Sequence, residues 1–415
     1  MHEDIIVGID VGSTKVRIAV GQRTYTEESK IPHLSIVGFV EEDSAGVNRG
    51  VITNVDDAVR AISKAIDKAE KSTGLPLETA WVSVNGSHIM SQVHRGIVAV
   101  QKVDGEIMQD DVMRSLEAAK TLSIPPNYEI IHVVPRAFAV DGQEGIKDPI
   151  GMNGRRLEVD AFIIEGMKSQ INNLTKSVYM SALDIEDIVV NPLACAEVVV
   201  TSKQKELGGC VLNIGSSTTS IAVYEQGELL HVRVLPIGSE HITSDIAIGL
   251  RTSLEVAESI KLTYGNAVVD AMVKGREISL SEFDPSEEGS VSLEYVCEII
   301  AARTEEIFEK VDEVLEDISR DASLPGGVIL CGGGARLPRI VEVAKQTLKM
   351  SATLGYPSNI AAVVDSVHDV AATCAVGLVK WGDMMTQSIH GGFSKYKSIK
   401  NVTNQMKKWF GSLMP

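Results

Sequence analysis

One short pattern occurs twice in this sequence, once in each half. Residues 9–20 read IDVGSTKVRIAV, and residues 212–223 read LNIGSSTTSIAV, so that Gly12 matches Gly215 and Ser13 matches Ser216. Each copy predicts an apolar strand, a turn rich in glycine and hydroxyl residues, and a second strand that alternates. A single copy could be an ordinary hairpin, since glycine-serine turns are common. Two copies in register favour a duplicated α/β architecture.

The two turns have the chemistry of a phosphate-binding site. A glycine-containing turn exposes backbone N–H groups, and neighbouring hydroxyls add further donors for phosphate oxygens. Asp10 ends the first strand, where its carboxylate could hold Mg²⁺ through water, as this cation keeps much of its hydration shell. Facing hairpins would clamp a nucleotide's phosphates between two similar domains. The predicted phosphate-binding residues are Gly12, Ser13, Thr14 and Lys15, with Gly215, Ser216, Ser217 and Thr218.

A third glycine-rich segment predicts the rest of a nucleotide site. Residues 328–338 read VILCGGGARLP, an apolar strand that enters Gly332, Gly333 and Gly334. Consecutive glycines let the backbone approach a flat ligand closely, and Arg336 could stack on a base. Alone, this segment could be a tight strand–helix turn. After two phosphate hairpins it indicates an adenosine site, and hence ATP with Mg²⁺ as the ligands.

Charge is distributed unevenly along the 415 residues. The chain has 39 basic and 56 acidic residues, a net charge of −17. Residues 395–415 contain five lysines and no acid, so this segment is +5 and the remainder is −22. The 44% apolar content excludes a disordered chain, and the acidic body argues against nucleic-acid binding. The five cysteines have no CxxC spacing, which disfavours a zinc site and indicates reduced, buried thiols.

The two hairpins and the triple-glycine segment together resemble the actin/Hsp70/sugar-kinase ATPase superfamily. Residues 191–197, NPLACAE, and 371–378, AATCAVGL, are similar to its two connecting helices. Glu258 and Lys261 resemble a pair that contacts ribose in Hsp70-like members. The resemblance implies an α/β, actin-like two-domain ATPase fold: duplicated RNase H-like domains around a nucleotide cleft.

Longer segments resemble one branch, the FtsA family of bacterial actin-like cell-division proteins. These segments are residues 132–146, 148–152 and 233–247. The resemblance implies five parts: subdomain 1A (1–82 and 160–205), an inserted subdomain 1C (83–159), subdomain 2A (206–240 and 310–385), subdomain 2B (241–309), and a linker with a C-terminal amphipathic helix (386–415). It also implies partners: the C-terminal tail of the tubulin-like protein FtsZ at 2B, other copies of the chain in a protofilament through 1C, and later division proteins.

The C-terminal segment has the pattern of a membrane-surface helix. On a helical wheel from Ile399 to Met414, the apolar side chains fall within an arc of roughly 140°, with lysines mostly outside it. A terminal helix docked on the protein's own core is the usual alternative, but the preceding Gly391-Gly392 and the clustered lysines favour an anionic membrane surface. We expect a peripheral protein on the cytoplasmic side of the cytoplasmic or inner membrane, at the division site. The predicted membrane residues are Ile399, Val402, Met406, Lys407, Lys408, Trp409, Phe410 and Leu413.

Two positions depart from the superfamily pattern. Asn213 stands where most members have an Asp that positions hydrated Mg²⁺, and Asn191 stands where many have a Gln or Glu that orients the attacking water. Asp10, Asn191 and Asn213 are thus the candidate catalytic residues. The two carboxamides predict slow or absent hydrolysis, with ATP acting mainly as a conformational ligand.

Three other functions are possible on such a fold. A cytoplasmic pilus-assembly protein would share the inserted subdomain, but is not expected to end in a basic amphipathic helix. A small-molecule kinase is less favoured, because it needs a carboxylate base in the cleft and the sequence shows none apart from Asp10. A chaperone of the Hsp70 type is disfavoured because only a short tail follows the second connecting segment.

Overall fold

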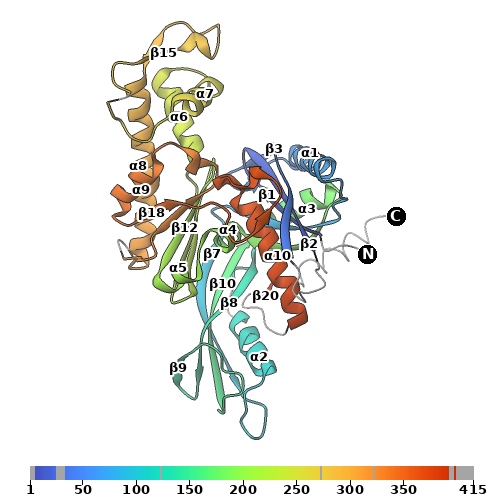
Figure 1. Cartoon of the computed structure of the whole chain (residues 1–415). Helices are drawn as coiled ribbons and strands as arrows, with labels where there is room; N and C mark the ends of the chain where they lie inside the picture. Colours follow the sequence, from blue (N-terminus) through green and yellow to red (C-terminus); the bar gives the residue numbers. More distant parts are fainter. Residues whose placement is uncertain are drawn as a thin grey trace.

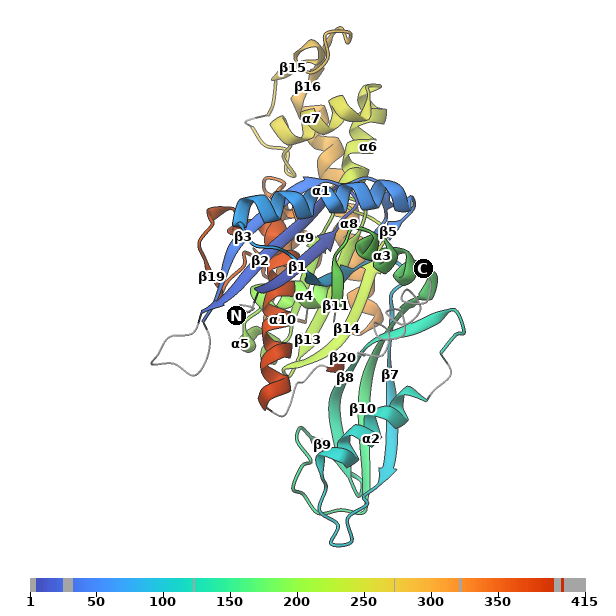
Figure 2. The same cartoon turned by 90° about the vertical axis from the view of Figure 1, so that its right-hand side faces the viewer.

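The computed structural model describes residues 5–24, 33–121, 124–271, 273–320, 323–391 and 397–398. Two central sheets form the body, and a smaller subdomain projects from each end (Figures 1 and 2). One projection, yellow to light orange, contains residues 240–300, and the other, cyan to green, contains residues 95–160. The predicted membrane segment, from Ile399 to Leu413, lies outside the described residues.

The first central sheet contains the first copy of the repeated pattern. Its strands are β1 (Ile5–Val11), β2 (Lys15–Thr24), β3 (His33–Asp43), β6 (Thr79–Val84), β11 (Asp184–Val190) and β19 (Ala361–Ala362). They lie in the order β11-β6-β1-β2-β3-β19. β1, β2 and β3 are antiparallel neighbours, whereas β6 runs parallel to β1 and β11 runs parallel to β6.

The second central sheet repeats this topology. Its strands are β12 (Gly209–Ile214), β13 (Thr219–Glu225), β14 (Glu228–Leu235), β17 (Val328–Cys331) and β18 (Ala352–Leu354). Their order, β14-β13-β12-β17-β18, corresponds strand by strand to β3-β2-β1-β6-β11, with the same directions. The predicted duplicated α/β architecture is confirmed.

Helices cover the outer face of each sheet. On the first sheet these are α1 (Val55–Thr73) and α3 (Lys168–Met180), and α8 (Leu293–Asp317) and α9 (Ile340–Leu348) belong to the second half. α1 begins where the Asn54 side chain accepts a hydrogen bond from the Asp57 N–H (3.2 Å), and it ends at Gly74 in the left-handed conformation. Alternate residues of β12 separate the two faces: Leu212 packs with α8 and α9, and Val211 packs toward the interior of the molecule.

Two helices lie between the sheets and connect the halves. They are α4 (Asn191–Val199), which has Pro192 in its first turn, and α10 (Thr373–Gly391). α4 follows the last main strand of the first half but packs on β12 and β13, whereas α10 follows the second half and packs on β1, β2 and β6. They cross at Gly377, where a Cβ would overlap the carbonyl oxygen of Ala194. A Cβ on Gly8 of β1 would overlap the carbonyl oxygen of Ala375, so both close approaches require glycine.

The inserted subdomain is a separate sheet with its own core. It contains β7 (Met90–Ala99), β8 (Tyr128–Val140), β9 (Gln143–Ile146) and β10 (Arg156–Met167), with α2 (Gln109–Lys120) packed against it. A two-residue strand, β20 (Lys397–Ser398), completes the order β20-β8-β10-β7, and β9 pairs with β8. Val133 and Ile163 pack under α2 against Val112 and Leu116.

The opposite end is mainly helical. It consists of α6 (Ser239–Leu250), α7 (Leu254–Tyr264), the first turns of α8, and the hairpin of β15 (Glu277–Ser279) and β16 (Ser290–Ser292). The remaining short elements are β4 (Val47–Asn48), β5 (Val51–Ile52), α5 (Ser202–Leu207) and the 3₁₀ turns Leu280–Glu282, Gly333–Arg336, Asp365–Val367 and Val370–Ala372. Among the described helices, none is both long and apolar enough to cross a membrane.

Candidate nucleotide-binding cleft

The two predicted hairpins have equivalent turns. The Gly12 N–H donates to the Lys15 carbonyl (3.0 Å), and the Gly215 N–H donates to the Thr218 carbonyl (2.8 Å). The flanking strands are also in equivalent register, because Asp10 pairs with Arg17 as Asn213 pairs with Ser220. The sequence repeat is thus a repeat of backbone geometry.

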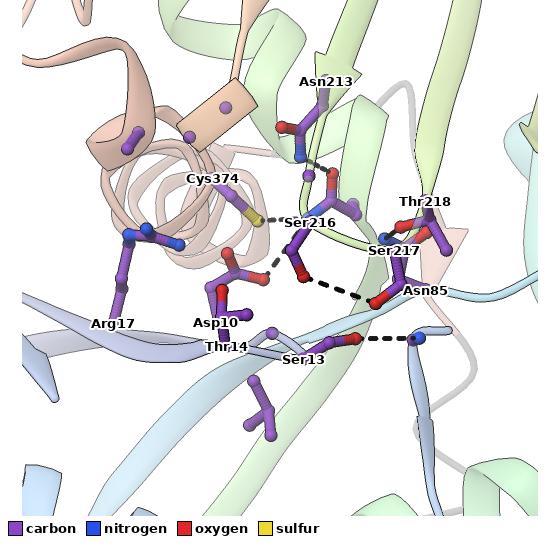
Figure 3. A pocket seen from close by; sticks show the side chains of 18 residues that line it. Asp10, Ser13, Thr14, Arg17, Asn85, Asn213, Ser216, Ser217, Thr218 and Cys374 are labelled. Atoms are coloured by element: carbon purple, nitrogen blue, oxygen red, sulfur yellow. Dashed lines mark hydrogen bonds between the residues drawn. The ribbon is translucent and has the colours of Figure 1, made fainter. Parts of the chain in front are cut away.

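Both turns line one cleft between the halves, with an open volume of about 540 Å³. Figure 3 shows the side chains of Asp10 and Ser13 on one side and those of Ser216, Ser217 and Thr218 on the other. Twelve predicted site residues line the cleft: Asp10, Gly12, Ser13, Thr14, Asn191, Asn213, Gly215, Ser216, Ser217, Thr218, Gly332 and Gly333.

Five residues of the prediction do not line the cleft: Lys15, Glu258, Lys261, Gly334 and Arg336. Lys15 pairs instead with Asp43 (Nζ–Oδ1, 2.7 Å), the residue opposite it on β3. The guanidinium of Arg336 pairs with Asp369 (Nε–Oδ1, 2.9 Å). Each side chain already has a carboxylate partner.

Glu258 and Lys261 lie on α7, in the helical end of the second half. They form an ion pair (Nζ–Oε2, 2.6 Å), and Lys261 also donates to the Thr243 hydroxyl (2.7 Å). Lys261 is buried, so this cluster joins α7 to α6. The structure therefore brings together the residues of the three glycine-rich segments but leaves this pair outside the cleft.

A buried chain of polar side chains forms the floor of the cleft. Asp10 Oδ1 accepts hydrogen bonds from the Ser83 hydroxyl (2.5 Å) and from Asn191 Nδ2 (3.3 Å). Asn191 Nδ2 also donates to Cys374 Sγ (3.0 Å), and Asn191 Oδ1 accepts from Asn213 Nδ2. Because Asn191 begins α4 and Cys374 lies on α10, these hydrogen bonds connect both hairpins to both inner helices.

The floor has one carboxylate, which suits a strongly hydrated cation. Within the described residues that line the cleft, Asp10 is the sole acid. The described part of the chain contains no group of three or more His, Cys, Asp or Glu side chains placed to hold a metal ion directly. Mg²⁺ typically binds through one or two carboxylates, several waters and the phosphates of a nucleotide, so Asp10 fits this cation through water.

Position 332 requires glycine for two reasons. Its φ of +87° favours glycine, and a Cβ there would overlap the Asn213 side-chain oxygen. Its N–H donates to the Val370 carbonyl (2.8 Å), which fixes the turn against the start of α10. The backbone of this turn therefore lies directly against the polar floor of the cleft.

Sequence reasoning missed six lining residues: Val11, Arg17, Gly50, Asn85, Ala371 and Cys374. Asn85 bridges the two halves, because its Nδ2 donates to the Thr218 hydroxyl (3.0 Å) and its Oδ1 accepts from the Ser220 hydroxyl (2.8 Å). Asn85 directly follows β6, which is parallel to β1. A polar residue at the carboxyl end of an apolar strand was the signal that could have found it.

Three cysteines from three elements gather beneath the floor: Cys195 of α4, Cys331 of β17 and Cys374 of α10. All are buried and reduced. Burial raises the pKa of Cys374 to about 11, so its thiol is protonated at neutral pH. A hydrogen bond with Cys195, together with burial, also raises the pKa of Cys331. The floor beside Asp10 thus gains no second negative charge from these thiols.

Comparison with known proteins adds family evidence. Residues 210–377 match the model described as cell division protein FtsA, and residues 86–165 match the SHS2 domain inserted in FtsA. The chain is 32% identical to cell division protein FtsA of Pseudomonas aeruginosa over 98% of this chain and 97% of that protein. It is 36% identical to FtsA of Bacillus subtilis, over 92% of this chain and 84% of that protein.

Solved structures with this fold are actin-like. A chain of the PilM–PilN type IV pilus biogenesis complex superposes with a TM-score of 0.65 at 14% identity, covering 91% of this chain and 98% of that one. MreB5 of Spiroplasma citri bound to AMPPNP has a TM-score of 0.55 at 12% identity, covering 94% and 99%. These likenesses confirm the predicted actin-like α/β fold.

Proposed function

Because the chain belongs to the FtsA family of cell-division proteins, we propose that it is an ATP-binding protein that polymerises on the inner face of the cytoplasmic membrane. There it tethers FtsZ filaments and recruits later division proteins. The observation that carries this proposal is the cleft, with equivalent hairpins from the two halves on opposite sides.

ATP is the proposed ligand because the cleft presents donors where phosphates would lie. The two turns offer backbone N–H groups and the hydroxyls of Ser13, Thr14 and Ser216. Mg²⁺ supplies positive charge that neutralises the phosphates when it is bound, and Asp10 would hold it through water. A ligand that touches both turns favours the closed arrangement of the halves.

Hydrolysis is proposed to be slow. Asn191 uses its Nδ2 for Asp10 and Cys374 and its Oδ1 for Asn213, so its amide is already engaged at both ends. An amide held in this way is poorly placed to orient an attacking water. ATP therefore acts mainly as a conformational ligand that favours assembly.

The FtsZ tail is proposed to bind the helical end, which the family resemblance assigns to subdomain 2B. Three apolar side chains of α6 and α7 are exposed there: Ile248, Leu254 and Leu262, the last with 75% of its surface accessible. Tyr295 at the start of α8 is also exposed. Exposed apolar side chains of this kind are available for contact with the apolar residues of a peptide.

Self-association is proposed to use the inserted subdomain. Its edge strand β7 exposes Val93 and Ile97, and the neighbouring segments expose Val103 and Met108. An edge strand with exposed apolar residues favours contact with another chain. The proposed contact joins copies into an actin-like protofilament.

Pelleting with anionic vesicles tests the tether, with and without ATP and a labelled FtsZ tail peptide. We expect the chain and peptide to pellet together, and Trp409→Glu to abolish pelleting because the acid replaces an apolar side chain on the proposed membrane face. Tyr356→Glu, a change at an exposed aromatic residue of the body, is the matched control and should pellet normally. The Leu262→Asp variant should still pellet with the vesicles but should leave the peptide in the supernatant, because Leu262 lies in the proposed peptide site. Unchanged pelleting of Trp409→Glu would refute membrane attachment through the tail.

A further inference from the structure

The chain's own tail forms a strand on the inserted sheet. β20 pairs antiparallel with β8, so that Lys397 lies opposite Val133 and Ser398 lies opposite His132. Figure 2 shows β20 near the top of β8, next to the C-terminal end of α10. The contact thus lies where the inserted subdomain joins the body.

The edge of β8 that receives β20 is available for a strand. β10 pairs along the opposite edge of β8, from Tyr128 to Val140. β9 occupies the outer edge only from Phe138 onward. In the part of the chain that the structure describes, β20 is the one strand on the outer edge before Phe138. An uncovered strand edge presents N–H and C=O groups that accept another strand readily.

We propose that this edge of β8 is a docking site for residues Lys397–Ser398, and that docking fixes the point where the membrane segment leaves the body. The proposal rests on the membrane function proposed above, because the predicted membrane face begins at Ile399, the residue after Ser398. Residues 392–398 after α10, if extended, could span roughly 23–25 Å. When Lys397 and Ser398 are docked, the membrane segment starts from one fixed position on the body instead of anywhere within that span. One side of the body then faces the membrane.

The docking edge is linked to the floor of the nucleotide cleft through His132 and Val190. His132, opposite Ser398, is buried, and its Nε2 accepts a hydrogen bond from the Val190 N–H (3.2 Å). Val190 immediately precedes Asn191, which holds Asp10. The His132 ring also packs against Trp381 of α10, with ring centroids 5.6 Å apart. Two residues, His132 and Val190, therefore connect the docked Ser398 to Asn191 in the polar floor.

Hydrogen–deuterium exchange on the full chain tests docking. Ser398→Pro removes a backbone N–H and disfavours a ladder at this position, whereas Ser398→Ala keeps the N–H. We expect the peptide covering residues 130–134 to exchange at least threefold faster in Ser398→Pro than in the wild type, with Ser398→Ala unchanged. Equal exchange in all three proteins would overturn the docking site.

Two further measurements separate docking from membrane binding. Trp409→Glu should lose pelleting with phosphatidylglycerol vesicles yet keep the slow exchange of residues 130–134, since the docking contact does not involve Trp409. If Trp409→Glu pellets normally, the proposed membrane function fails while docking stands. On vesicles, the wild type should keep the slow exchange. Faster exchange on vesicles would show that the tail leaves β8 when it binds lipid, and would overturn the fixed exit point.

Discussion

At the scale of single residues, the direction of one amide organises the cleft floor. Asn191 donates to Asp10 and Cys374 and accepts from Asn213, so its two ends cannot exchange places without losing these partners. Neighbouring sequence indicated the types of residue present but not their orientation. The hydrogen bond between Asn191 and Asn213 joins residues from different halves, and its existence depends on how the halves pack.

Asn213→Asp tests the charge of the floor. The change removes the donor to Asn191 and places a second carboxylate near Asp10, which should favour Mg²⁺ by about tenfold, or roughly 1.4 kcal/mol. We expect tighter Mg²⁺ binding by titration and faster ATP turnover. Asn213→Ala, which lacks both the donor and the charge, should show neither gain. Wild-type turnover as fast as that of an efficient ATPase would contradict the proposed slow hydrolysis.

His132 should make the chain less stable in mild acid. Burial lowers its pKa to about 3, against roughly 6.5 in an unfolded chain. Between these values the unfolded state binds more protons, so this contribution to stability is complete above pH 6.5. It falls by about 1.4 kcal/mol per pH unit below that value.

Chemical denaturation from pH 8 to pH 5 measures this effect. His132→Gln should show a smaller loss of unfolding free energy on acidification than the wild type. Burial also lowers the pKa values of His88 and His231, so part of the acid sensitivity should remain in the variant. The same slope in both proteins would show that His132 is not the source.

At the scale of elements, local patterns were predictable and tertiary contacts were not. The hairpins and the triple-glycine turn are encoded by consecutive residues, and eleven of the residues predicted from them line the cleft. Lys15 and Arg336 were assigned to the ligand from their positions near those turns. Asp43 and Asp369, which pair with them, are 28 and 33 residues away in sequence, and no local pattern signals such pairing.

The close crossing of α4 and α10 predicts that a larger residue at Gly377 lowers the stability of the fold. A Cβ at Gly377 would overlap the backbone of Ala194, so Gly377→Ala must separate the two helices. We expect a loss of roughly 1–3 kcal/mol in unfolding free energy. Gly249→Ala on α6 is the control, because its nearest neighbour is the flexible end of Ile299 and alanine favours a helix. Thermal and urea unfolding measure both, and equal effects would contradict the close crossing.

At the scale of the whole molecule, ATP should stabilise the fold because its site requires both halves. A ligand that binds only the folded state adds about 2.7 kcal/mol at one hundred times its dissociation constant. Ser13→Glu places a carboxylate in the proposed phosphate site and should remove the ATP-dependent rise in melting temperature. Ser202→Glu, at an exposed position of α5 outside the cleft, should keep it. A rise retained by Ser13→Glu would contradict the proposed site.

The placement of the two inner helices has a consequence for any attempt to separate the two halves. Each half ends in a helix that covers a sheet of the other half, and the two helices cross backbone against backbone. A fragment ending near residue 205 would lack α10. The face of the first sheet that α10 covers, including Gly8, would then be exposed to solvent. Neither half should therefore fold as a soluble fragment.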